Sequence, residues 1–160
     1  MSEHEEIILA LKETSSIFSE AAVECLAALF GAEAVVEDEW QVVERLHGEF
    51  DRMITMGMAN DQYSSLILVA MNEETLCQLL GEDEIDLEYA SSALGEFVNT
   101  YCALLSDQAI FSDKFGKQIQ AVPLLYTGGC PFLPFLTGIE GYLTLDSHRI
   151  YVGYTTRKGN

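Results

Sequence analysis

A glutamate and an asparagine three residues apart, Glu96 and Asn99, offer two side chains that could act together on a ligand. If the segment that carries them is helical, side chains three positions apart are neighbours on one surface. The pair would then present a carboxylate, which accepts hydrogen bonds, beside a carboxamide, which both donates and accepts them. Ser92 would lie about one helical turn before Glu96 and could add a hydroxyl group. These residue types can hydrogen-bond to a polar partner or to a water molecule.

Such a pair needs a helix that is exposed on one side and buried on the other. Residues 86–106 have helical periodicity, and their apolar side chains form one stripe: Leu87, Ala90, Leu94, Phe97, Val98, Tyr101, Leu104 and Leu105. On a helical wheel with Leu94 at 0°, the positions of Ser92, Glu96 and Asn99 fall between roughly 140° and 200°. The three polar residues therefore share the face opposite the stripe. The ordinary interpretation of such a face is a solvated helix surface with no function.

The remaining segments predict an α+β domain in which helices cover one face of a mixed or antiparallel sheet. Residues 5–30 have helical periodicity with Gly31 as the stop, and Asn72 is placed to cap a short helix that ends at Gly81. Strands are expected within 34–43, at 50–58 and 63–71 as a hairpin, at 117–125, and at 139–145 and 149–155. We expect residues 1–160 to form a single domain.

The two long helical segments resemble each other. Residues 15–25 align without gaps against residues 91–101, so that a Ser-Ser pair recurs and Glu20 aligns with Glu96. Val23 stands where the second segment has Asn99. Two helices with similar burial requirements can produce such a likeness by chance, so the alignment is consistent with an internal repeat without establishing one.

Composition excludes several kinds of partner. The chain has 8 basic and 26 acidic residues and a net charge of −18, which disfavours nucleic acid and anionic membranes as partners. The first six residues lack the basic and apolar regions of a signal peptide, and no apolar run is long enough to span a bilayer. We therefore expect a cytoplasmic protein with free cysteines. The four cysteines and three histidines share no ligand spacing, so no bound metal is expected.

The spacing of Ser92, Glu96, Asn99 and Pro123 resembles a known signature. In the CheX/CheC family of response-regulator phosphatases, Asp or Ser is followed after three residues by Glu, after two by Asn, and further on by Pro. Here 23 residues separate Asn99 from Pro123, one more than is usual. The likeness in residues is concentrated in 92–128, including the stretches 95–99 and 121–128.

This resemblance implies two long pseudo-symmetric helices packed on a sheet, and a protein phosphatase that accelerates hydrolysis of aspartyl phosphate on CheY-like response regulators in chemotaxis or two-component signalling. It implies that Asn99 orients the attacking water and that Glu96 pairs with a lysine of the regulator, with Ser92 as a peripheral substrate-binding residue. No cofactor of its own is implied, because the regulator supplies Mg²⁺. The resemblance also implies that CheC-like members carry the Glu/Asn pair on both long helices and CheX-like members on only one. Because Val23 replaces the asparagine in the first helix, the chain is placed nearer CheX than CheC. Such proteins commonly form homodimers through their sheets, for which residues 139–154 would offer an edge.

Two other interpretations stay open at this point. A non-catalytic adaptor with the CheX/CheC fold could bind a signalling partner without hydrolysing anything, and the longer spacing between Asn99 and Pro123 is compatible with it. An unrelated α+β domain that binds a small molecule would need a concave site, which the sequence does not reveal. The segment from Thr127 to Pro134 is rich in Gly and Pro but lacks the residues of a phosphate-binding loop, so a plain turn is expected.

Overall fold

The computed structural model describes residues 1–48, 50–127 and 137–159. The elements are α1 (Glu3–Phe30), β1 (Val35–Val43), β2 (Arg52–Ala59), β3 (Tyr63–Met71), α2 (Glu73–Leu80), α3 (Leu87–Asp107), α4 (Ala109–Phe115), β4 (Ile119–Gln120), β5 (Leu124–Tyr126), β6 (Gly138–Leu145) and β7 (His148–Lys158). No helix in the described ranges is long and apolar enough to cross a membrane.

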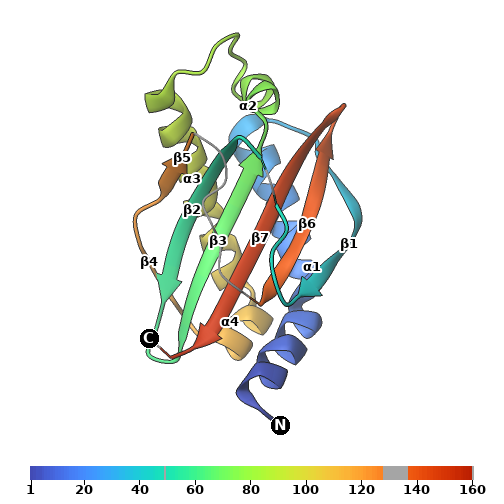
Figure 1. Cartoon of the computed structure of the whole chain (residues 1–160), viewed down its shortest axis with the longest axis vertical. Helices are drawn as coiled ribbons and strands as arrows, with labels where there is room; N and C mark the ends of the chain where they lie inside the picture. The colour runs from blue at the N-terminus through green and yellow to red at the C-terminus, as the bar shows by residue number, and fades with distance from the viewer. Residues whose placement is uncertain (49, 128–136, 160) are drawn as a thin grey trace.

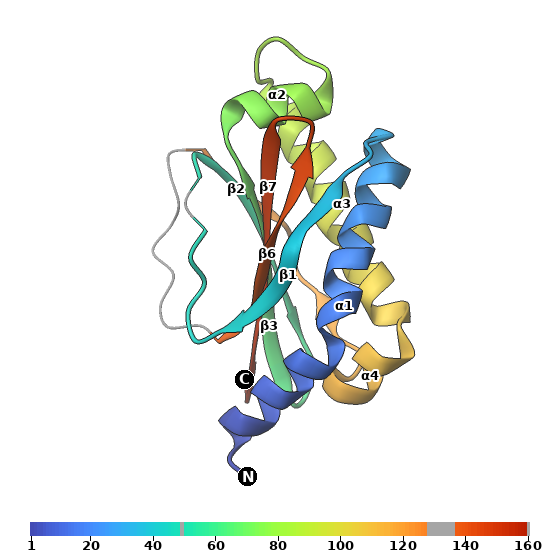
Figure 2. The same cartoon turned by 90° about the vertical axis from the view of Figure 1, so that its right-hand side faces the viewer.

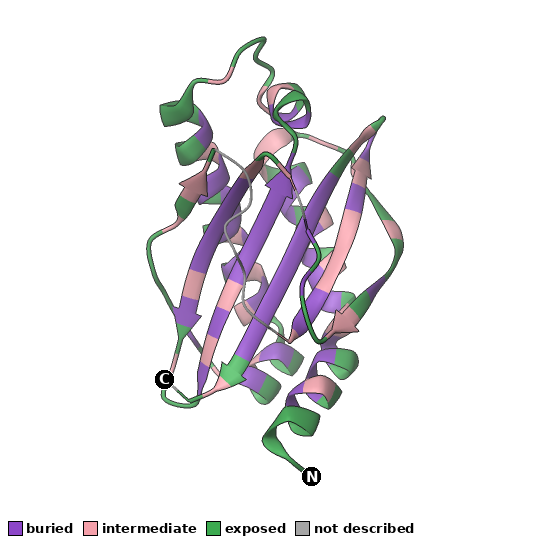
Figure 3. Cartoon of the chain, viewed as in Figure 1, coloured by how far each residue is buried: buried purple, intermediate pink, exposed green. Residues whose placement is uncertain are grey.

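One sheet organises the described residues. Six of its seven strands follow the order β1-β6-β7-β3-β2-β4, and the seventh, β5, also pairs with β2. Every strand pair in the described ranges is antiparallel. Helices α1, α3 and α4 all lie on the same face of this sheet, while the segment that follows β1 crosses the other face (Figures 1 and 2). Because both faces are covered, most residues of the central strands are buried (Figure 3). The predicted α+β class is therefore confirmed, with an antiparallel sheet.

Most of the predicted elements are confirmed. The two long helices lie within two residues of their predicted bounds, and Gly31 and Gly81 end α1 and α2 in the left-handed conformation. The hairpin of β2 and β3 turns at Asn60, whose side-chain oxygen accepts hydrogen bonds from the backbone N–H groups of Gln62 and Tyr63. The pseudo-symmetry of the two long helices stays a prediction.

The region between α3 and β6 differs most from the prediction. The strand expected at 117–125 is two short strands, β4 and β5, and Pro123 lies between them rather than in a strand. Proline has no backbone N–H to donate to a strand ladder, so pairing with β2 is interrupted there. Helix α4 was not predicted, although Phe111 and Phe115, one turn apart and both buried, are typical of a short amphipathic helix.

Two smaller predictions were wrong, and a third is confirmed only in part. Leu87 was assigned to the buried stripe, but as the first residue of α3 it is 54% exposed. Asn72 is the N-cap residue of α2, as predicted, yet its side chain makes no capping hydrogen bond. The hairpin of β6 and β7 offers no free edge, because β6 pairs with β1 on one side and β7 pairs with β3 on the other. Of the turn predicted from Thr127 to Pro134, residues 128–134, which include Cys130, lie outside the described residues.

The inner face of α3 is fixed to α1 and to the sheet. Phe97 stacks on Phe30 of α1, with 6.2 Å between the ring centroids. The Tyr101 hydroxyl donates a buried hydrogen bond of 2.9 Å to the backbone carbonyl of Phe18, and burial raises the pKa of Tyr101 well above its usual value, so the hydroxyl remains a donor. The Cys102 Sγ atom lies 3.5 Å from the Sδ atom of Met58 in β2. These contacts hold α3 in a fixed rotation about its axis.

We expect Tyr101→Phe to destabilise the fold modestly, because it removes only this hydrogen bond and keeps the ring. A net loss of about 1 kcal/mol is typical, and it should lower Tm by roughly 2–4 °C in a domain of this size. Tyr89→Phe on the same helix is the control, since Tyr89 is exposed and its hydroxyl has no partner in the described part of the chain. Thermal unfolding followed by circular dichroism measures both; equal shifts would contradict the assigned role.

Candidate functional site

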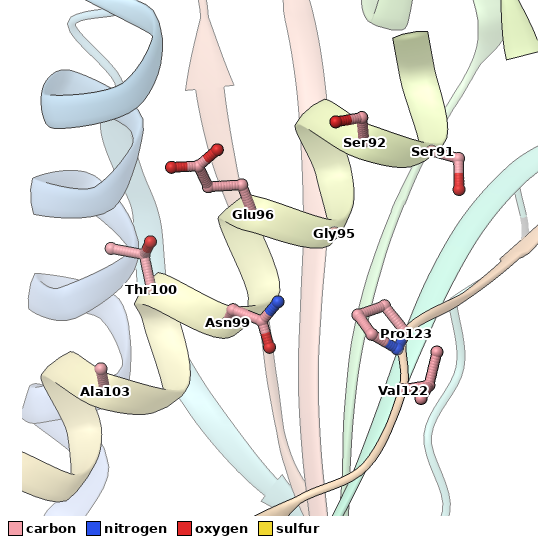
Figure 4. A pocket seen from close by; sticks show the side chains of 9 residues that line it. All are labelled: Ser91, Ser92, Gly95, Glu96, Asn99, Thr100, Ala103, Val122 and Pro123. Carbon is pink, nitrogen blue, oxygen red and sulfur yellow. The ribbon is translucent and has the colours of Figure 1, made fainter. Parts of the chain in front are cut away.

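The outer face of α3 carries the three residues that the sequence predicted. Ser92, Glu96 and Asn99 are all exposed there and line an open depression of about 640 Å³. The other residues that line it are Ser91, Gly95, Thr100, Ala103, Val122 and Pro123. Figure 4 shows Asn99 leaving the helix on the side of Val122 and Pro123, whereas the Glu96 carboxylate points to the other side of α3.

The N-terminal end of α3 is fixed by Asp86. Its side chain accepts hydrogen bonds from the backbone N–H groups of Glu88, at 3.0 Å, and Tyr89, at 3.2 Å. These bonds satisfy two of the N–H groups that have no partner within the helix. The site residues Ser92, Glu96 and Asn99 lie well inside this 21-residue helix, where the backbone does not fray. The outer face therefore presents its side chains from a rigid element.

The second side of the depression is formed by residues 121–123, between β4 and β5. The backbone N–H of Ala121 donates to the carbonyl of Gly57 in β2 at 2.8 Å, which holds this connection at the sheet edge. Pro123 packs over Gly95 of α3: a Cβ atom placed on Gly95 would lie 3.7 Å from the ring of Pro123. The side chain of Val122 is left 77% exposed. Helix α3 and this connection thus border the site, and their contact joins Gly95 and Pro123, 28 residues apart in sequence.

The polar groups of the site are free to bind a partner. Within the described ranges, Glu96 and Asn99 have no side-chain hydrogen bond and Glu96 has no ion pair. The lining residues include no Lys, Arg or His. No group of three or more His, Cys, Asp or Glu side chains in the part of the chain that the structure describes could hold a metal ion. The site therefore offers hydrogen-bonding groups and a negative charge, and no cation.

The structure brings together all four residues of the sequence signature, because Ser92, Glu96, Asn99 and Pro123 line one depression. Their roles remain predictions. Gly95 and Val122 were not identified from the sequence as site residues, since only the packing of the 121–123 connection against α3 places them there. On α1, Glu20 is exposed and Val23 is half-buried and packs against the hydrophobic core.

Comparison with known proteins gives similarity in structure only. No family model and no curated protein matches the chain. The chemotaxis protein CheX from Vibrio vulnificus is similar, with a TM-score of 0.74 and 14% identity over 91% of this chain and 99% of the other. A CheC-like superfamily protein from Shewanella sp. PV-4 is also similar, with a TM-score of 0.72 and 16% identity over 89% of this chain and 96% of the other.

Two structures of complexes are also similar. A CheX–CheY–BeF3–Mg²⁺ complex from Borrelia burgdorferi gives a TM-score of 0.59 and 15% identity over 89% of this chain and 96% of the other. A FliG–FliM complex from H. pylori gives a TM-score of 0.58 and 8% identity over 91% of this chain and 92% of the other. At such identities the likeness establishes the fold alone. The order of the elements, the antiparallel sheet and the helices on one of its faces agree with it, and the chain has the CheX/CheC fold.

Proposed function

We propose that this chain is a protein phosphatase that accelerates hydrolysis of aspartyl phosphate on CheY-like receiver domains. The observation that carries the proposal is that Glu96 and Asn99 lie exposed and without partners on a rigid helix face. Ser92 and Pro123, which complete the signature of the CheX/CheC phosphatases, line the same depression. The activity would take place in the cytoplasm, within the single domain of residues 1–160.

The chemistry needs positioning more than covalent help. Hydrolysis of a phosphoryl group requires a water molecule in line with the bond that breaks, and little covalent work falls to the protein. The Asn99 carboxamide both accepts and donates hydrogen bonds, so it would hold this water in line with the phosphorus atom and the aspartate oxygen. Glu96 would form a charge-assisted hydrogen bond with a lysine of the receiver and so orient α3 in its cleft.

The charge of the site favours a substrate that brings its own cations. The lining residues include Glu96 and no basic residue, and the chain carries a net charge of −18. A free phosphate ester would be repelled by this surface. A receiver domain holds its phosphoryl group beside its own lysine and Mg²⁺, which neutralise that charge before the two proteins meet. In this proposal the chain needs no cofactor of its own, and the receiver supplies Mg²⁺.

The similarity to the CheX–CheY complex supports this choice of partner, because it is a structure of similar fold in a complex with CheY. The direct test is the decay of aspartyl phosphate on CheY-like regulators from the same cell, in the presence of Mg²⁺, with and without the protein. We expect faster decay with at least one regulator. Absence of both binding and faster decay across the whole set would overturn the assignment.

A non-catalytic adaptor is the second candidate. It is favoured by the similarity to FliM, described in a complex with FliG, and by the longer spacing between Asn99 and Pro123. An adaptor would bind the phosphorylated regulator and leave the lifetime of its phosphoryl group unchanged. Measuring binding and decay on the same samples separates the two candidates.

A further inference from the structure

Gly95 is unusual because neither its backbone nor its packing requires glycine. It lies in the interior of α3, where glycine destabilises a helix relative to alanine. The other described glycines, Gly57 excepted, have positive φ angles or neighbours too close for a Cβ atom: Gly31, Gly48, Gly81, Gly116, Gly138, Gly141, Gly153 and Gly159. On Gly95, a Cβ atom would lie 3.7 and 3.8 Å from two atoms of Pro123, which is ordinary van der Waals contact. Alanine would therefore fit the folded chain.

The position of Gly95 in the depression indicates a role in binding rather than in folding. It lines the depression together with Ser91 and Asn99, which lie one turn to either side of it on α3, and Val122 lines the opposite side. Glycine is the residue that lets another molecule approach a backbone closely. Gly95 itself is buried, and a methyl group there would contact Pro123 and raise the floor of the depression beside Asn99.

We propose that Gly95 and Val122 determine how a partner docks beside Asn99. This inference rests on the proposed function and names the two contacts that shape the receiver's approach. Gly95 is buried beneath Pro123 and has no side chain, so the floor of the depression stays low between Asn99 and Pro123. The receiver segment next to the phosphorylated aspartate can then reach the Asn99 carboxamide. Val122 contacts that segment and supplies apolar area, because the lining residues carry no cation that could supply affinity.

The exposure of Val122 supports this role. Its side chain is 77% exposed on a short connection whose neighbour Pro123 packs on α3. An exposed apolar side chain next to polar catalytic groups becomes buried when a partner covers the site, as at the centres of protein interfaces. Val35 in β1 is also an exposed valine, at 67%, but it lies at the opposite edge of the sheet.

The test of Gly95 separates docking from folding. We expect Gly95→Ala to raise Tm by roughly 2–4 °C, because alanine favours the helix, and to raise the half-saturating receiver concentration about tenfold. Gly57→Ala is the matched control: a Cβ on Gly57 would lie in ordinary contact, 3.8 Å from the Cβ of Ala121, and Gly57 does not line the depression. Alanine also keeps the backbone carbonyl that accepts the hydrogen bond from Ala121. It should leave the half-saturating concentration unchanged. An unchanged value in Gly95→Ala as well would overturn the role of Gly95.

Val122→Ser tests the opposite side. We expect the half-saturating receiver concentration to rise about fivefold, since part of a buried valine contact is lost, with little change in the maximal decay rate. Val35→Ser, which changes another exposed valine at the opposite edge of the sheet, should behave as the wild type. Equal effects of the two serine variants would contradict a docking contact at Val122.

The same variants distinguish this inference from the proposed function. If the wild type does not accelerate decay, its affinity for a receiver loaded with beryllofluoride and Mg²⁺ is measured by titration instead. Affinity that falls in Gly95→Ala and Val122→Ser but not in the controls would support the docking contacts and overturn only the phosphatase. Affinity that no variant changes would overturn the docking contacts, and absence of any binding would overturn both.

Discussion

Replacing Asn99 with alanine is expected to slow the protein-dependent decay of aspartyl phosphate by on the order of a hundredfold. The loss follows from the absence of any substitute in the site. Ser92 and Thr100 have shorter side chains at other positions on α3, and Glu96 points to the other side of the helix (Figure 4). Without the carboxamide, the water molecule is no longer held in line, and the barrier rises by the lost positioning. Single-turnover decay of a phosphorylated receiver with Mg²⁺ measures the effect.

The stability of Asn99→Ala is expected to equal that of the wild type, because the Asn99 side chain is exposed and has no partner in the described part of the chain. Asn72→Ala is the matched control: Asn72 is also exposed, and its side chain makes no capping hydrogen bond. That variant should retain the wild-type rate. A variant at Asn99 that binds the receiver and still accelerates decay fully would show that another group orients the water.

The elements that the sequence predicted well are those whose own residues determine them. The apolar stripe of α3 follows from the spacing of Leu94, Phe97 and Tyr101, all of which are buried. The hairpin of β2 and β3 follows from two apolar runs separated by four residues that favour a turn. Local patterns of this kind need no knowledge of what lies across the fold.

The strand predicted at 117–125 was wrong for the opposite reason. Its apolar residues resemble a strand, but Ile119 and Leu124 are exposed by 82% and 57%, and only short pieces pair with β2. Pro123 interrupts the ladder and packs on Gly95 instead. That contact joins residues 28 positions apart, so it could not be inferred from spacing. The side of the depression formed by Val122 was therefore missed, although the helix face opposite it was predicted.

The two long helices illustrate how a similar sequence can differ in use. Glu20 on α1 is exposed like Glu96 on α3, but Val23 packs against the core where α3 has an exposed asparagine. A valine side chain cannot hydrogen-bond to water, so α1 lacks the group that would position a nucleophile. In the proposed function only α3 would act on a receiver.

Replacing Glu96 with glutamine is expected to weaken docking more than it slows the bound reaction. Glutamine keeps the size of the side chain but loses the charge that would pair with the receiver's lysine. Removing one partner of a desolvated ion pair costs about 2 kcal/mol or more, so the half-saturating receiver concentration should rise roughly thirtyfold. The maximal decay rate should fall less, because Asn99 still holds the water. Titrating the receiver at fixed protein concentration separates the two quantities.

Glu20→Gln on α1 is the control for charge, since Glu20 is an exposed glutamate that aligns with Glu96 and lies outside the depression. It removes the same charge from the chain and should leave both quantities unchanged. Salt gives an independent check: screening weakens an ion pair, so added salt should raise the half-saturating concentration of the wild type more than that of Glu96→Gln. Equal salt dependence in the two proteins would mean that Glu96 forms no ion pair with the receiver, and its role would then be limited to hydrogen bonding.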